Sequence, residues 1–198
     1  YSKQQRIDSN LILLLKADLD WEEGTKEFKE KIAVGVAEQL NSSYFKNRIY
    51  FGMADEYKGS KITLSTLVTA LVNNNQVQED VKKTHSKIAD VFKLIQKVIP
   101  KYSFNDGAYF SQNQGIRVLF RLLYLIQRNY GANTVQASKE EFFGDLGTIF
   151  DDDLIANLKD DYGLGGVNAS VKRIIEKVQE KYSDKYGSMK TSLTLLRK

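Results

Sequence analysis

Apolar residues recur mostly at helical spacing along the chain. The pattern is plainest between residues 25 and 40, where Lys and Glu separate apolar residues at four-residue steps: Phe28, Ile32, Val36 and Leu40. This period places those side chains on one face of a helix. We expect shorter helices over residues 11–19, capped by Ser9-Asn10, and over residues 66–72, capped by Ser65.

The second half of the chain shows longer helical patterns. Residues 77–99 form an amphipathic stretch that Pro100 ends. Residues 116–130 are apolar around nearly the whole circumference of a helix, which is typical of the central helix of a bundle. Ser138 and Glu141 have the spacing of a capping box.

The last sixty residues predict two further helices with a break between them. Three aspartates, 151–153, stand before the apolar stretch 154–158, where their charge suits the positive end of a helix. The glycine-rich run 163–166 predicts a flexible break, and Asn168 is the expected cap of the final helix. Residues 188–198 predict a weakly ordered tail unless another part of the protein docks them.

Strand signals are confined to one short region. Residues 49–51 read as a strand, and residues 61–64 are expected to pair with it as a hairpin around the turn 58–60. The sequence therefore predicts an all-α or mainly α fold, a multi-helix bundle with at most a small two-stranded β element near residues 49–64.

The polar run Asn73–Gln76 is the best candidate for a linker. It divides the chain into an N-terminal helical segment with the small hairpin, residues 1–75, and a helical bundle domain, residues 76–198. The chain begins without Met. Either the chain is cut from a longer protein or its N-terminus is trimmed; in the first case we expect residues 1–75 to continue a domain that lies upstream.

Composition excludes several kinds of chemistry. The 198 residues include no Cys and one His, which removes disulfides, thiolate metal sites and Cys nucleophiles. His85 lies beside Val81 and Ile88 on a mostly apolar face and is expected to be a partly buried structural residue. We therefore expect no catalytic residue, no metal site and no cofactor, and we interpret the chain as a non-enzyme.

Membrane and export signals are also absent from the pattern. The longest apolar run, Leu11–Leu15, is far shorter than the ~20 residues that cross a bilayer. The first residues lack the charged, apolar and small-residue regions of a signal peptide. We expect no membrane association and a cytoplasmic location.

The formal net charge is +4, but the charged residues are unevenly distributed along the sequence. Residues 107–138 carry three arginines and no acid, whereas residues 139–161 carry two lysines and eight acids. Residues 162–198 carry eight basic and three acidic side chains. An acidic segment thus lies between two basic ones.

The three arginines share one helical stripe with a tyrosine. Arg117, Arg121, Tyr124 and Arg128 fall at offsets 0, 4, 7 and 11, which is one narrow face of a helix. Guanidinium groups at one-turn intervals suit a phosphate backbone, and the tyrosine ring offers a stacking surface. Alternatively, the arginine stems cover the solvated edge of a core helix.

Basic residues also gather on the predicted C-terminal helix, where the candidates for phosphate contact are Lys172, Arg173 and Lys177. Acids interleave with them, so intrahelical ion pairs on a solvated face are the alternative. The aspartates 151–153 have two interpretations as well, a hard-cation site or a helix cap. Consecutive residues point in different directions, which favours the cap.

Short apolar and glutamine-containing segments follow one another in a recognisable order: residues 2–11 (SKQQRIDSNL), 37–41 (AEQLN) leading to Arg48-Ile49, 62–67 (ITLSTL), 110–119 (FSQNQGIRVL) and Tyr186-Gly187. This series resembles the region downstream of the signature in DGQHR-domain proteins. That family includes the DndB-type proteins of DNA sulfur-modification systems and relatives with a ParB-like core.

The signature Asp-Gly-Gln-His-Arg itself is missing, since residues 106–110 read DGAYF, and no functional residue of the ParB-like core carries over. The resemblance implies a helical C-terminal region with a role in DNA modification, defence or its regulation. Two hypotheses follow. The first is a non-catalytic helical domain of a DNA-associated protein that binds nucleic acid through a basic helix face. The alternative is a protein–protein interaction or dimerisation module, in which the acidic segment pairs with basic helices across subunits.

Overall fold

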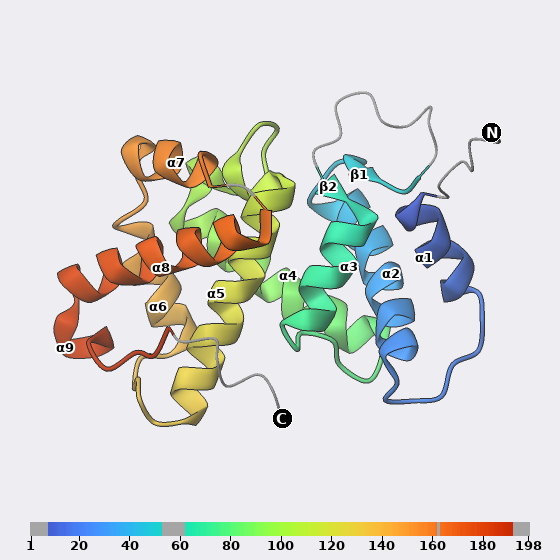
Figure 1. The fold of residues 1–198 in the computed structure, drawn as a ribbon, viewed down its shortest axis with the longest axis horizontal. Coiled ribbons are helices and arrows are strands. Elements are labelled where there is room, and N and C mark those ends of the chain that lie inside the picture. The colour runs from blue at the N-terminus through green and yellow to red at the C-terminus, as the bar shows by residue number, and fades with distance from the viewer. Residues whose placement is uncertain (1–7, 53–61, 162, 192–198) are drawn as a thin grey trace, which may run out of the picture.

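A computed structural model describes residues 8–52, 62–161 and 163–191 (Figure 1). The described residues form nine α-helices: α1 (Ser9–Ala17), α2 (Lys26–Ser43), α3 (Leu64–Asn73), α4 (Val81–Val98), α5 (Asn113–Gly131), α6 (Lys139–Gly147), α7 (Asp152–Lys159), α8 (Gly163–Lys181) and α9 (Ser183–Tyr186). They also form two 3₁₀ helices and two short strands: η2 (Pro100–Tyr102), η3 (Tyr109–Ser111), β1 (Ile49–Tyr50) and β2 (Ile62–Thr63). The predicted mainly α class is confirmed.

The helices pack around α5 and α4. In Figure 1, α1, α2 and α3 lie on one side and α5 to α9 on the other. Helix α4 packs against both α2 and α6, and α5 packs against both α3 and α8. Helix α5 is buried over most of its surface, as its apolar circumference predicts, and the residues at or below 1% exposure include Ile116, Val118, Leu119, Phe120, Leu122, Leu123, Leu125 and Ile126.

One apolar core runs through the molecule. Phe92 of α4 stacks on Phe104 with ring centroids 4.0 Å apart, and Phe45, after α2, meets both rings edge-on. Gln76, inside the predicted linker, is fully buried, and its Nε2 donates to Gln127 Oε1 of α5 at 3.2 Å. The division into residues 1–75 and 76–198 stays a prediction, but the core is continuous across that position.

The two strands correct the predicted hairpin. Ile49 pairs with Ile62 and Tyr50 with Thr63 in parallel register, whereas hairpin strands are antiparallel. Side chains of neighbouring helices fix the pair in this direction. The Ile49 N–H donates to Asn41 Oδ1 and the Thr63 N–H to Asn113 Oδ1, each at 2.9 Å. The expected turn at 58–60 lies outside the described residues.

Two predicted caps are wrong by two residues or fewer. Helix α1 is capped by Asp8, whose carboxylate accepts from the Asn10 N–H at 2.7 Å. Helix α3 is capped by Thr63 and not by Ser65. The reason is tertiary: buried Asn10 accepts from the Ser65 N–H at 2.8 Å, so both residues join α1 to α3.

The caps of α6 and α7 follow the prediction. Ser138 and Glu141 form a complete capping box, and Asp151 accepts from the Leu154 N–H at 2.7 Å. The predicted break at 163–166 is wrong, because these residues are the first turn of α8, and Asn168 lies inside the helix. Gly166 permits this start: a Cβ there would fall 2.6 Å from the Asp161 carbonyl carbon.

The described part of the predicted tail is docked. The Lys190 N–H donates to Asn129 Oδ1 of α5 at 2.8 Å, and Met189 is buried. Residues 188–191 therefore meet the condition under which we expect the tail to be ordered, while 192–198 lie outside the described residues. In the stretches that the structure describes, no helix has the length and apolar character that crossing a bilayer requires.

Candidate functional site

The predicted stripe on α5 lies at the edge of the core. Arg117, Arg121, Tyr124 and Arg128 are all half-buried, in a helix whose remaining surface is mostly covered. Helix α5 packs against both α3 and α8, and Arg117 and Arg121 lie where residues of these two helices approach it. The long arginine side chains are partly covered by their surroundings.

Two of these arginines line a pocket of about 320 Å³ between α3, α5 and the first turns of α8. That volume falls within the range of small-molecule sites, ~300 to 1,000 Å³. No acidic side chain of the described residues lines it. The lining is made by Thr69, Ala70, Asn73, Asn74, Arg117, Arg121, Val167 and Asn168.

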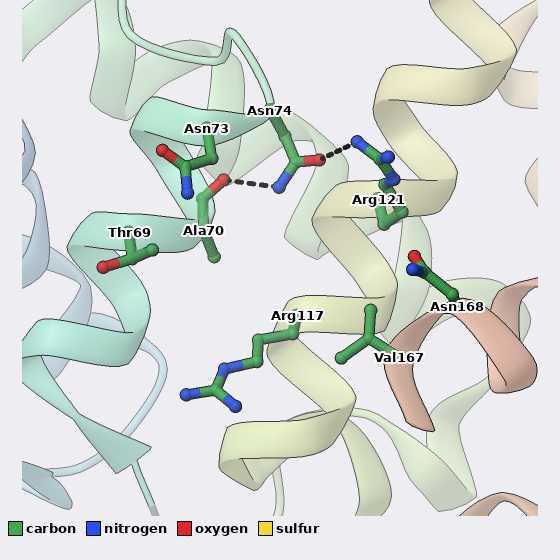
Figure 2. A pocket seen from close by; sticks show the side chains of 8 residues that line it. All are labelled: Thr69, Ala70, Asn73, Asn74, Arg117, Arg121, Val167 and Asn168. Atoms are coloured by element: carbon green, nitrogen blue, oxygen red, sulfur yellow. Dashed lines mark hydrogen bonds between the residues drawn. The ribbon is translucent and has the colours of Figure 1, made fainter. Parts of the chain in front are cut away.

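The two guanidinium groups occupy different parts of the pocket. Figure 2 shows Arg121 reaching toward Asn74 while Arg117 extends along the opposite part of the pocket. Arg121 Nη1 donates to Asn74 Oδ1 at 3.5 Å, and Arg117 Nη2 donates to Thr66 Oγ1 at 3.3 Å. Because a guanidinium carries five N–H donors, each group keeps most of its donors for a ligand.

The electrostatics of the stripe favour an anion. Burial is the main cause that lowers the pKa of Arg121; Tyr124 raises it in part, and the neighbouring charge of Arg128 adds a smaller lowering effect. The group nevertheless stays protonated at neutral pH. Among the described residues, the arginines paired with a carboxylate are Arg48 and Arg173, not those of the stripe. A half-buried cation without a counterion gains the most from a bound anion.

Tyr124 lies directly beside Arg121, whose guanidinium is 5.5 Å from the centre of the ring. This arrangement is a cation–π contact. It holds the Arg121 side chain beside the pocket and covers one face of the ring. Arg128 continues the stripe toward the C-terminal end of α5 and does not line the pocket.

The basic candidates on α8 lie outside the pocket. Lys172 and Arg173 are exposed, and each has a carboxylate partner, Glu176 at 3.7 Å and Asp161 at 3.8 Å. Lys177 is half-buried. Their positive charge is therefore partly neutralised within the chain, and they support the site less directly than the arginines of α5 do.

The acidic segment 139–161 pairs in part with basic residues of the same chain, including Glu140 with Lys139 at 3.3 Å. Lys101 and the Tyr102 hydroxyl both donate hydrogen bonds to Asp152. The bond from Lys101 is the main reason that the pKa of Asp152 is lowered. The ion pairs join Asp145 to Lys185 (2.9 Å), Asp152 to Lys101 (2.6 Å) and Asp161 to Arg173 (3.8 Å).

His85 and the aspartates 151–153 lie outside the pocket lining within the described parts of the chain. His85 is half-buried, and its Nε2 has no partner there. Asp151 acts as a helix cap, as expected. No group of three His, Asp or Glu side chains in those parts of the chain is placed to hold a metal ion.

Several pocket residues were missed at the level of sequence. Asn73 and Asn74 belong to the predicted linker, and Asn168 is the predicted cap of the final helix. A turn or a helix cap already explains an asparagine at each of these three positions. The sequence therefore gives no separate indication that they line a pocket. The pocket exists because α3 and α8 approach α5 from opposite sides, and the helical period of each segment does not encode that approach.

Comparisons with protein-family models, with curated proteins and with solved structures found no match to this chain. The resemblance to DGQHR-domain proteins therefore stays a prediction.

Proposed function

We propose that this chain is a non-catalytic helical domain of a DNA-associated protein and that it binds nucleic acid through the basic face of α5. The observation that carries the proposal is the stripe of Arg117, Arg121 and Arg128, which lacks carboxylate partners among the described residues. Tyr124 adds a ring beside the charges. The resemblance to DGQHR-domain proteins points the same way.

The charge layout supports this proposal over a purely structural role. If the arginines of the stripe only covered the edge of the core, pairing with nearby carboxylates would stabilise them. The chain has eight acidic residues in 139–161. Three of those acids pair with Lys101, Arg173 and Lys185 instead. The arginines of α5 stay available, and arginine is well suited to phosphate recognition because its planar group forms paired hydrogen bonds.

The proposal is tested by titrating the chain with fluorescently labelled DNA, duplex and single-stranded, at low and at moderate salt. We expect binding at low salt that weakens steeply as salt rises, because counterions are released from phosphates. The variant R117Q/R121Q should lose affinity at least about tenfold at low salt, since each lost contact is a charge-assisted hydrogen bond.

The matched control is K82Q/K97Q, which removes two charges from exposed positions of α4, a helix that contributes nothing to the pocket. It should lose much less affinity than R117Q/R121Q. Absence of binding to either form of DNA at low salt contradicts the proposal, as does an equal loss in both double variants.

The interaction or dimerisation module stays the alternative. Its basis in the sequence was the acidic segment, which pairs substantially within one chain. Light scattering at low and high salt separates the two functions: a monomer at high protein concentration counts against dimerisation, and a salt-sensitive dimer favours it.

A further inference from the structure

The pocket between α3, α5 and α8 has a rim and an inner wall of different chemistry. Thr69, Asn73 and Asn168 are exposed, while Ala70 and Val167 are 4% and 7% exposed. The entrance is therefore polar and uncharged, and the inner wall is apolar. The two guanidinium groups are the charged groups of the lining (Figure 2).

The positions of the two arginines do not suit a single anion. They leave α5 four residues apart, ~6 Å along the axis, and their ends diverge toward Thr66 at the start of α3 and Asn74 after its end. One phosphate would contact one guanidinium. A ligand that engages both must carry two anionic groups separated by a neutral part.

The middle of the pocket suits an aromatic heterocycle with polar edges. Ala70 and Val167 offer apolar contact. The amides of Asn73 and Asn168 each carry both donors and acceptors, and within the described residues neither makes a hydrogen bond. Asparagine amides recognise the edges of nucleobases in this way.

We infer that the pocket accepts one unstacked nucleotide of single-stranded DNA, with Arg117 and Arg121 at the phosphates on either side of it and Asn73 and Asn168 at its base. This inference rests on the proposed function and specifies the form of DNA. Bases of a duplex are stacked and paired, whereas bases of a single strand turn outward into protein pockets.

The experiment compares a labelled single strand of about 20 nucleotides, longer than the ~4 to 16 that one single-strand-binding fold occupies, with the blunt duplex of the same sequence. Both are titrated by fluorescence anisotropy at one low salt concentration. We expect the single strand to bind at least about tenfold tighter, because the pocket contacts depend on an unstacked base.

Two variants on adjacent residues of α8 isolate the pocket. N168W fills the entrance without changing charge and should lower single-strand affinity about tenfold or more, the loss of one stacked or hydrogen-bonded base. A169W places the same ring on an exposed residue that does not line the pocket, and its affinity should equal that of the unmodified chain. Circular dichroism checks that both variants fold.

A second pair serves if N168W fails to fold. N168D brings a negative charge to the pocket entrance and A169D brings it one residue away, so N168D should weaken single-strand binding more. The outcomes separate the two claims. Equal affinity for duplex and single strand, or equal effects of the paired variants, overturns the pocket inference alone. Absence of binding to both DNAs overturns the proposed function and this inference together.

Discussion

Single polar side chains decide how the N-terminal helix joins the rest of the molecule. Asp8 caps α1, and the buried Asn10 next to it accepts from the Ser65 N–H at 2.8 Å on α3. Removing the Asn10 amide would leave that N–H without its partner, which costs about 1 to 3 kcal/mol for a buried donor. The sequence indicates that a cap lies here, but the tertiary role of Asn10 depends on the position of α3.

Asp8 gives the N-terminal cap a pH dependence. The hydrogen bond from the Asn10 N–H is the main cause of a pKa below the ordinary value of Asp8. A carboxylate with a lowered folded-state pKa stabilises the fold above its unfolded pKa, and this contribution is lost as pH falls through the folded value. Asn caps a helix about as well as Asp but does not titrate.

We therefore expect the unfolding free energy of the unmodified chain to fall more than that of D8N between about pH 5 and pH 2. Urea denaturation at a series of pH values measures both. Parallel curves for the two proteins over that range would show that Asp8 does not act as an ionised cap.

At the scale of the elements, two glycines differ in how closely the backbone of another element approaches them. A Cβ on Gly115, in the first turn of α5, would fall 1.9 Å from the Tyr109 carbonyl oxygen of η3. A Cβ on Gly144, inside α6, would meet nothing within 4 Å. The first glycine allows the approach of two elements, and the second adds flexibility without a packing role.

G115A should therefore destabilise the chain by at least about 2 kcal/mol, because the backbone of η3 must move. G144A should stabilise it by about 0.5 to 1 kcal/mol, because alanine restricts the unfolded chain more than glycine does. Denaturation midpoints of the two variants measure the difference. Similar effects of both substitutions would contradict the close approach of η3 and α5.

The sequence predicts the helices well and their contacts poorly. The spacing of apolar residues locates α2, α4 and α5, and Ser138 with Glu141 locates the start of α6. The parallel strand pair, the glycine-initiated α8 and the docked Met189 depend on contacts between distant segments. The arginine stripe follows from the helical period alone. The asparagines that complete the pocket do not, because α3 and α8 place them there.

The continuous core implies that the whole molecule unfolds as one unit. Phe45, Phe92 and Phe104 contact one another and join α2 to α4 across the polar run 73–76. Trp21, whose indole N–H donates to the Lys16 carbonyl at 2.8 Å, reports on the N-terminal helices. Circular dichroism reports on the helices of the whole chain.

We expect the fluorescence of Trp21 and the helical signal to change at the same urea concentration, as a two-state transition requires. F92A should shift both midpoints together and cost about 3 to 5 kcal/mol, the range for a buried Phe replaced by Ala. Two separate transitions would support the division into residues 1–75 and 76–198 as independent domains.

The salt dependence of DNA binding tests most directly whether the arginines of α5 contact phosphates. Each phosphate neutralised contributes about 0.7 to 0.9 to the slope of log K against log salt. For R117Q/R121Q we expect the slope to become shallower by about 1.4 to 1.8, with no such change in K82Q/K97Q. An unchanged slope in R117Q/R121Q, or the same change in the control, would contradict phosphate binding by this face of the molecule.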